Sequence, residues 1–188
     1  MSGRIYDHVA RLLSETISEN QRVLEIGGGS GQYRDLVAGK YWCLDLHSNY
    51  YGGRVDVFGD ARRLPLADNS IDRAFMVAVL ITIDDADGAL RECARILRPG
   101  GSVTVFDYSW WVSWRLTRRD PQHHQTLSTR ALRGKLRDLG LVPTTHYGCV
   151  PSPPGFTFPS LLRPLLYPIS RWNVVSGMKA ESRPHPGE

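Results

Sequence analysis

The chain has 188 residues, enough for one domain with a single hydrophobic core. With 41% hydrophobic and 22% charged residues, its composition is that of a folded globular protein and excludes disorder along the whole chain. The net charge of +4 comes from arginines spread along the sequence, which argues against a nucleic-acid binder with one basic face.

Cysteine usage and hydropathy predict a cytoplasmic location. Cys43, Cys93 and Cys149 are far apart and have no metal-ligand or redox spacing, so we expect no metal site and a reducing compartment. The N-terminal segment lacks the apolar core of a signal peptide. No run approaches the ~18 apolar residues that a membrane span needs.

The first 46 residues predict two helices and two strands. Apolar residues recur at helical spacing from Ile5 to Ile17, which is typical of an amphipathic helix. A short apolar run at 22–26 predicts a buried strand that ends at glycine. A second helix is expected at 32–39, with Gly39 as its stop, and a second strand at 41–46.

Strands and helices continue to alternate up to residue 108. A short strand is expected at 55–58, and the apolar run 71–83 predicts a strand with its exit loop. A helix begins near 86 and is ended by Pro99-Gly100-Gly101, and a strand follows at 102–108. Such alternation implies βαβ units with a mostly parallel sheet.

The C-terminal third predicts one further helix and two strands. The helix spans 126–141, with Ser128 or Thr129 as N-cap and Gly140 as C-cap. A β-like run follows at 142–147, and 171–180 predicts a closing edge strand. We therefore expect a Rossmann-like, doubly wound α/β sheet with helices on both faces and an antiparallel C-terminal edge strand. One domain would span 1–180, with 181–188 as a frayed tail.

The stretch VLEIGGGSGQYR, residues 23–34, places four glycines within five positions directly after the first strand. Glycine allows positive φ and lets backbone approach a ligand closely, so the loop predicts a cofactor site. A dinucleotide loop would need a third glycine where Gln32 stands, and the lysine of a Walker loop is absent. A tight structural turn is the alternative interpretation.

Residues 25–31, Glu-Ile-Gly-Gly-Gly-Ser-Gly, resemble the first motif of class I S-adenosylmethionine-dependent methyltransferases. The stretches GDARRLPLADNSIDRAF and ALRECARILRPGGSVTVFDY resemble further segments of that family. The resemblance covers roughly 23–108 and is close to the small-molecule methyltransferases of ubiquinone/menaquinone biosynthesis. It implies S-adenosylmethionine as cofactor and a small or lipid-like metabolite as methyl acceptor.

The resemblance also implies which residues hold the cofactor. Loop amides would face its methionine carboxylate, and an acidic residue near the loop would hold its ammonium group. An acidic residue that ends the second strand would accept the ribose hydroxyls, and a further acidic residue the adenine amine. These cofactor residues are Glu25, Gly27, Gly29, Gly31, Asp45, Leu46, Asp60, Ala61 and Val77.

Each of the three carboxylates also has a purely structural interpretation. Glu25 could cap a helix or pair with Arg22, Asp45 could be an exposed strand end, and Asp60 could start a solvent-facing turn.

Methyl transfer depends mainly on aligning two bound reactants, and a base is needed only if the acceptor must lose a proton. Tyr108, His123 and His124 are weak candidates for that base. The tryptophans at 110, 111 and 114 favour a lid over the pocket, with a membrane-surface segment or a plain surface helix as alternatives.

Three rival functions are weighed against this one. A non-catalytic scaffold subunit could keep the fold, a nicotinamide oxidoreductase could use the glycine loop, and an RNA methyltransferase could use Arg115, Arg118 and Arg119. A monomer or a homodimer fits the sequence equally well.

Overall fold

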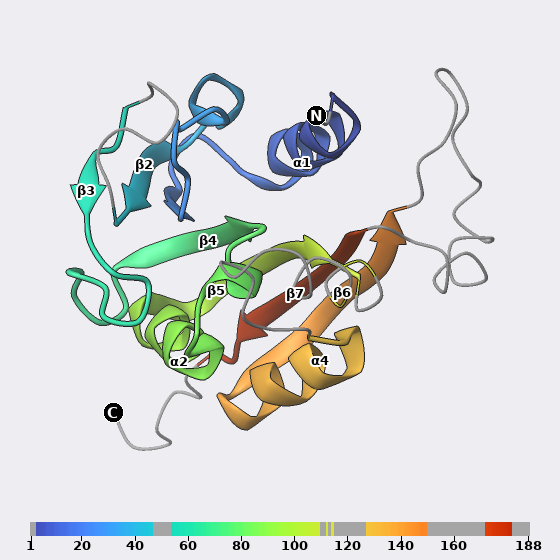
Figure 1. Ribbon diagram of the computed structural model, residues 1–188. Helices are drawn as coiled ribbons and strands as arrows, with labels where there is room; N and C mark the ends of the chain where they lie inside the picture. Colours follow the sequence, from blue (N-terminus) through green and yellow to red (C-terminus); the bar gives the residue numbers. More distant parts are fainter. Residues whose placement is uncertain are drawn as a thin grey trace, which may run out of the picture.

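A seven-stranded sheet forms the centre of the computed structural model, which describes residues 3–46, 54–109, 112, 114, 127–149 and 172–181 (Figure 1). Its strand order is β3-β2-β1-β4-β5-β7-β6. The strands are β1 (Arg22–Ile26), β2 (Lys40–Asp45), β3 (Val57–Phe58), β4 (Ile71–Val77), β5 (Leu97–Tyr108), β6 (Leu141–Cys149) and β7 (Trp172–Lys179). Neighbouring strands are parallel except where β7 pairs with β5 and β6. The predicted Rossmann-like, mostly parallel sheet is confirmed.

The order of the strands reverses at the centre of the sheet. From β1 the chain moves outward through β2 to β3, then returns to β4 on the other side of β1. In doubly wound sheets, ligands bind beyond the carboxyl ends of the strands at such a reversal. We therefore expect a ligand to bind at the loops that follow β1 and β4.

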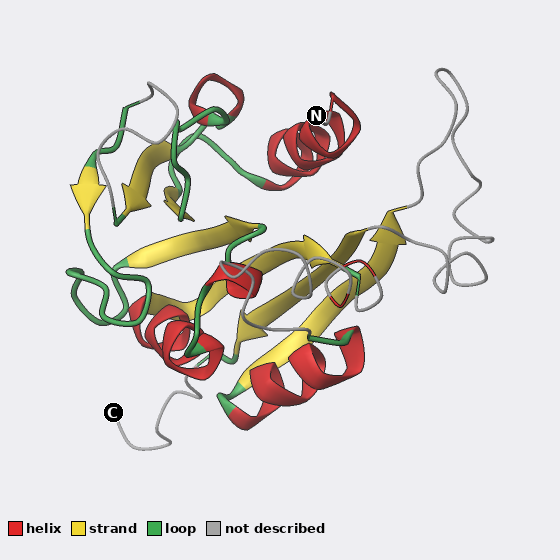
Figure 2. Cartoon of the chain, viewed as in Figure 1, coloured by secondary structure: helices red, strands yellow, loops and turns green. Residues whose placement is uncertain are grey.

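Helices cover the two faces of the sheet unequally (Figure 2). The helix α1 (Gly3–Thr16) packs on one face, and α2 (Ala86–Ile96) and α4 (Thr129–Asp138) pack on the other. Adjacent residues of β5 show the division, because Val105 belongs to the cluster with α2 and α4 while Phe106 joins the cluster with α1. This alternation is what the period of a strand requires.

The three predicted helices outside the glycine loop are confirmed, and side chains cap two of them. Asp85 accepts the backbone N–H of Gly88 at 2.8 Å at the start of α2. Ser128 accepts that of Ala131 at 3.1 Å at the start of α4. After α4, Gly140 takes φ +73°, the left-handed conformation that ends a helix.

The helix predicted at 32–39 is wrong, and only the short 3₁₀ turn η1 (Arg34–Leu36) forms there. The chain between the glycine loop and β2 has little room for a helix. Gly39 already lies against the backbone carbonyl of Gln21, and the backbone N–H of Lys40 donates to that carbonyl at 2.8 Å. Tyr33 is buried and stacks on Tyr6 of α1, with ring centroids 5.3 Å apart. Tertiary packing thus replaces the local helical preference of this segment.

The strand predicted at 102–108 begins earlier, at Leu97, so Pro99-Gly100-Gly101 lies inside β5 and does not end the helix. The helix α2 stops at Ile96, since Leu97 is extended with φ −69° and ψ 131°. Proline disfavours helical backbone at the residue before it, which here is Arg98. At Gly101 a side chain would meet the carbonyls of Asp72 and Ile71 at 3.1 and 3.2 Å, so glycine allows β5 to approach β4.

The remaining strands are confirmed with shifted ends. The strand predicted at 55–58 is reduced to β3, and that at 142–147 extends to β6. The predicted C-terminal strand forms as β7 in an antiparallel edge pair, with β6 as the outer member. Among the described residues, no helix has the length and apolar character needed to cross a bilayer.

Candidate functional site

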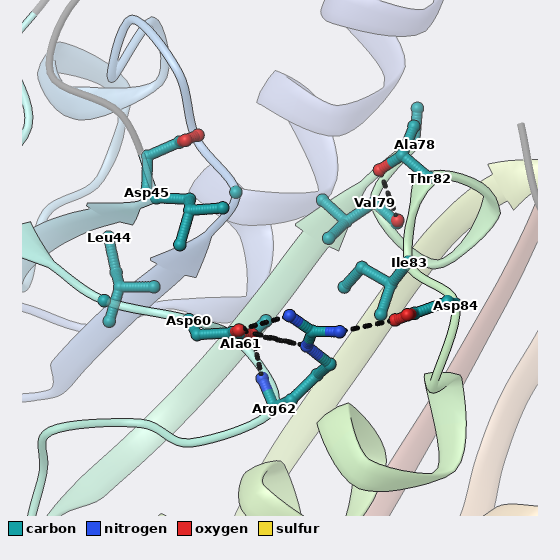
Figure 3. Close-up of a pocket in the computed structure, with 13 residues that line it drawn as sticks. Leu44, Asp45, Asp60, Ala61, Arg62, Ala78, Val79, Thr82, Ile83 and Asp84 are labelled. Carbon is teal, nitrogen blue, oxygen red and sulfur yellow. Dashed lines mark hydrogen bonds and ion pairs between the residues drawn. The ribbon is translucent and has the colours of Figure 1, made fainter. Parts of the chain in front are cut away.

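A cavity of about 390 Å³ opens at the carboxyl ends of the central strands (Figure 3). Its size falls in the range of small-molecule sites. Four loops line it, those that follow β1, β2, β3 and β4. The lining residues are Gly27, Leu44, Asp45, Leu46, Gly59, Asp60, Ala61, Arg62, Ala78, Val79, Thr82, Ile83 and Asp84.

The glycine loop is shaped by close packing against β2 and the loop after β4. Gly27 has φ +69°, and a Cβ at that position would lie 2.6 Å from Cγ2 of Val79. The backbone N–H groups of Gly27 and Gly28 both donate to the carbonyl of Leu44, at 2.7 and 3.2 Å. A glycine is therefore required where the loop passes the cavity wall.

The other predicted glycines support the loop and do not line the cavity. Gly29 has φ +55° and donates its N–H to Oδ2 of Asp45 at 2.8 Å. Gly31 has φ +63° and donates to the carbonyl of Gly28 at 3.0 Å. In this structure the loop amides thus bond within the chain, and their contact with a ligand carboxylate stays a prediction.

Asp45 ends β2 and Leu46 follows it, and both residues line the cavity. A carboxylate has about four acceptor positions, so the side chain of Asp45 can serve several donors at once. Leu46 is 57% exposed and adds an apolar surface at the mouth of the cavity. The position of Asp45 at the end of β2 is suitable for contact with a ribose diol.

Asp60 and Ala61 also line the cavity, but Asp60 already has an arginine partner. Arg62 forms an ion pair with Asp60 at 2.6 Å and a second with Asp84 at 2.6 Å. Figure 3 shows the guanidinium between these two carboxylates. The hydrogen bond from Arg62 is the main cause that lowers the pKa of Asp60. Asp60 therefore remains a negatively charged acceptor at neutral pH.

Glu25 lies beneath the glycine loop and outside the cavity. Its side chain is 2% exposed and accepts a hydrogen bond from the hydroxyl of Tyr41. Burial raises the pKa of Glu25 to about 8, although Tyr41 and the charge of Arg34 oppose the shift. A carboxyl in this state is mostly protonated at neutral pH, and the contact of Glu25 with a ligand ammonium stays a prediction.

The end of β4 presents different residues from the one predicted. Val77 packs with the cluster beneath α1 and does not line the cavity. The next two residues, Ala78 and Val79, line it instead. Ala78 has φ +57°, which is uncommon without glycine and turns the chain sharply after the strand. The turn η2 (Leu80–Thr82) follows.

Tyr108 ends β5, where its ring lies 4.1 Å from that of Trp172 on β7. His123, His124 and the predicted tryptophans at 110 and 111 lie outside the described residues. Trp114 is described and is 50% exposed. Among the described residues, no group of three or more His, Cys, Asp or Glu side chains could hold a metal ion.

Sequence reasoning missed three charged residues near these loops. Arg62 and Asp84 line the cavity from two different loops, and no local motif indicates their pairing. Asp107 is buried at the end of β5, and burial raises its pKa to about 7 although the backbone N–H groups of Tyr108 and Ile81 oppose the shift. An acidic residue within the apolar run 103–108 was the available signal for this residue.

Comparison with known proteins agrees with the geometry. Residues 24–105 match the family model described as a methyltransferase domain. The chain is 30% identical over 129 residues to a ubiquinone/menaquinone biosynthesis C-methyltransferase of Chromobacterium violaceum, which covers 58% of this chain and 52% of that protein. It is 30% identical over 123 residues to an O-methyltransferase of Aspergillus nomiae, with 54% and 53% covered.

Solved structures share the fold. A S-adenosylmethionine-dependent methyltransferase of Archaeoglobus fulgidus superposes with a TM-score of 0.71 at 15% identity, covering 95% of each chain. A methyltransferase of Haloferax volcanii, solved in complex with the Trm112 methyltransferase activator, gives a TM-score of 0.74 at 20% identity, with 96% of this chain and 90% of that chain covered.

This chain spans about half the length of the curated relatives described above. The matched segment nevertheless includes β1, the glycine loop, β4, α2 and most of β5, the part that builds much of the cavity. The domain match and the related proteins also support S-adenosylmethionine as the cofactor. These matches agree with the resemblance found in the sequence: residues 24–105 are similar to a methyltransferase domain, and the solved structures share the fold.

Proposed function

We propose that this chain binds S-adenosylmethionine in the cavity and transfers its methyl group to an oxygen, nitrogen or carbon nucleophile of a small or lipid-like metabolite. The observation that carries this proposal is the position of Asp45 and Asp60, which line one cavity from neighbouring strand ends beside Gly27. A ligand with a ribose diol and an amino group needs acceptors of this kind, and a charged acceptor strengthens each hydrogen bond.

The residues of the cavity fit the ligand by type. Asp45 would accept the ribose hydroxyls, while Asp60 and the backbone of Ala61 would contact the edge of the adenine. Val79 and Ile83 offer apolar walls for the flat base. When bound, S-adenosylmethionine supplies an electrophilic methyl group, so the residues of the chain need mainly to hold the reactants in line. Such positioning contributes ~7–11 kcal/mol to lowering a barrier.

The acceptor would approach from the ends of β4, β5 and β7, where Tyr108 lies against Trp172. The related proteins include quinone C-methyltransferases and an O-methyltransferase, which supports a small acceptor without fixing its reacting atom. A base among Tyr108, His123 and His124 stays a prediction. So do a hydrophobic or membrane contact, a cytoplasmic location and the choice between monomer and homodimer.

Calorimetric titration with S-adenosylhomocysteine, the demethylated product, tests cofactor binding directly. We expect micromolar binding to the unmodified chain and at least tenfold weaker binding to Asp45→Ala, because the ribose loses its charged acceptor. Asp87→Ala is the matched control, since it removes an exposed carboxylate that pairs with Lys135 away from the cavity. Equal affinity in the Asp45 and Asp87 variants would contradict the site.

The same protein separates the rival functions. Absence of binding at millimolar S-adenosylhomocysteine would favour a non-catalytic scaffold, and binding of NAD(H) instead would indicate an oxidoreductase. Transfer of a labelled methyl group to quinols or other small phenols, with no salt-dependent binding to RNA, would support the metabolite methyltransferase over an RNA methyltransferase.

A further inference from the structure

Arg62 bridges the two sides of the cavity at the end where Asp60 lies (Figure 3). Its backbone N–H donates to Oδ1 of Asp60 at 2.8 Å, and its Nε lies 3.0 Å from both oxygens of that carboxylate. Its Nη2 donates to Oδ2 of Asp60 at 2.6 Å. On the other side, Nη1 donates to Oδ1 of Asp84 at 2.6 Å.

These contacts use most of the acceptor capacity of Asp60. A carboxylate offers about four lone-pair positions, and three N–H groups of Arg62 reach the two oxygens of Asp60, with the Nε–H group shared between both. An amino group of a ligand that approached Asp60 would therefore compete with the guanidinium.

We propose that Arg62 determines how the base of the ligand is recognised, because it occupies Asp60 until an amino group of the base displaces it. This inference rests on the proposed function, in which Asp60 binds the adenine amine. On displacement the guanidinium keeps its contact with Asp84, which holds the positive charge at the edge of the cavity. Arg62 and Asp84 are thus specificity-determining residues for the nucleoside. Arg62 acts by pairing with Asp60, and Asp84 acts by holding Arg62 after its displacement.

The exposure of Arg62 and Asp84 makes the exchange feasible. The side chains of Arg62 and Asp84 are 41% and 68% exposed, so neither is fixed by packing on all sides. Ion pairs at such exposure are weak and are screened by salt. The opening of the Asp60–Arg62 pair should therefore reduce ligand affinity by a small factor and should respond to ionic strength.

Titration with S-adenosylhomocysteine tests this competition, because that ligand carries no net charge at neutral pH. Removing a positive charge from the chain then has little direct effect on its attraction to the site. For Arg62→Gln we expect Kd to fall about two- to fivefold, since Asp60 no longer has to release a guanidinium. Arg63→Gln removes the same charge from the next, exposed residue and should leave Kd unchanged.

Asp84→Asn should change affinity in the opposite direction. Without the second carboxylate, the guanidinium has no alternative partner and competes more strongly for Asp60, so Kd should rise about twofold or more. Raising NaCl from 50 to 500 mM should improve binding to the unmodified chain more than to Arg62→Gln. Thermal unfolding of each variant without ligand shows whether a change in affinity comes from a damaged fold.

The outcomes distinguish this inference from the proposed function. If S-adenosylhomocysteine binds to no variant, the proposed function fails. If it binds but Arg62→Gln leaves Kd unchanged or raises it, Arg62 does not compete for Asp60 and this inference alone is wrong. The analogue S-inosylhomocysteine, which has an oxygen in place of the adenine amine, should bind more weakly to Arg62→Gln than the adenosyl compound does. Equal binding of the two would show that Asp60 does not recognise the amine and would overturn the inference.

Discussion

At the scale of single residues, Glu25 shows how burial changes the character of an acidic group. It lies beneath the glycine loop with a side chain that is 2% exposed, and its pKa is raised to about 8. In the unfolded chain an ordinary glutamate titrates near pH 4.5. Between pH 4.5 and about 8, Glu25 therefore keeps its proton in the folded protein, whereas the unfolded chain has lost it.

This difference predicts that stability falls as the pH rises. The contribution of Glu25 is fully present below pH 4.5 and is lost as the pH increases to about 8, with a slope of at most about 1.4 kcal/mol per pH unit. In Glu25→Gln the amide can still accept from Tyr41 but does not titrate. We therefore expect the variant to gain stability relative to the unmodified chain between pH 5 and 8, measured by urea unfolding.

Two comparisons make the pH prediction specific. Asp107 titrates in part of the same range. Its contribution is the same in both proteins, so it cancels in the difference between their free energies of unfolding. Glu15→Gln is the control, because Glu15 is exposed on α1 and pairs only at the surface with Arg11. A stability difference for Glu25→Gln that stays constant with pH would contradict the buried, protonated carboxyl.

At the scale of elements, two glycines predict opposite effects of the same substitution. Gly27 has φ +69°, and its Cβ would lie 2.6 Å from Val79, so Gly27→Ala should cost about 1–3 kcal/mol of stability. It should also weaken binding of S-adenosylhomocysteine, because the loop lines the cavity. Gly134 lies inside α4 with nothing within 4 Å of its Cβ position. Gly134→Ala should therefore add ~0.5–1 kcal/mol and leave binding unchanged.

Urea unfolding and calorimetric titration of both alanine variants check this pair. Gly134→Ala controls for the general effect of replacing glycine in the unfolded chain. If Gly27→Ala were as stable as the unmodified chain, the close approach between the loop and Val79 would be wrong.

The elements also show which features the sequence could predict. The strand β1 and its glycine loop were predictable, because a short apolar run ends at residues that allow positive φ. The helix predicted at 32–39 failed because the burial of Tyr33 against α1 outweighs the local pattern. In the sheet, β7 lies between β5 and β6. This order depends on pairing between segments far apart in the chain, which no local pattern predicts.

The same distinction holds for the candidate site. The position of Asp45 and Asp60 at one edge of the sheet could be predicted, because Asp45 ends β2 and Asp60 follows β3, and the carboxyl ends of parallel strands lie together. The contact of Arg62 with Asp84 could not, because it joins the loop after β3 to the loop after β4 across 22 residues of sequence. Val77 itself packs on the side of α1, whereas its neighbour Ala78 lines the cavity. Successive strand residues point to opposite faces, so a shift of one position changes the face.

At the scale of the whole molecule, the cavity joins the two halves of the sheet. The loop after β1, the end of β2 and the loop after β3 contribute Gly27, Asp45 and Asp60, while the loop after β4 contributes Val79 and Ile83. Within the sheet, the halves meet along the pairing of β1 with β4. A ligand that contacts loops from both sides adds a second connection between them, so binding should stabilise the domain as a unit.

Ligand-dependent thermal unfolding tests that coupling. At a concentration 100 times its Kd, S-adenosylhomocysteine should stabilise the folded state by about 2.7 kcal/mol. For a domain of this size that corresponds to a rise in Tm of roughly 5–10 °C. Adenosine or methionine alone, at the same concentration, should give a much smaller rise, because each reaches only part of the cavity and binds with far lower affinity.

Asp45→Ala should lose most of the rise in Tm, since the ribose that Asp45 contacts lies between the two ends of the ligand. An equal shift with adenosine alone would place all of the binding energy on one side of the sheet and contradict a site that joins both halves.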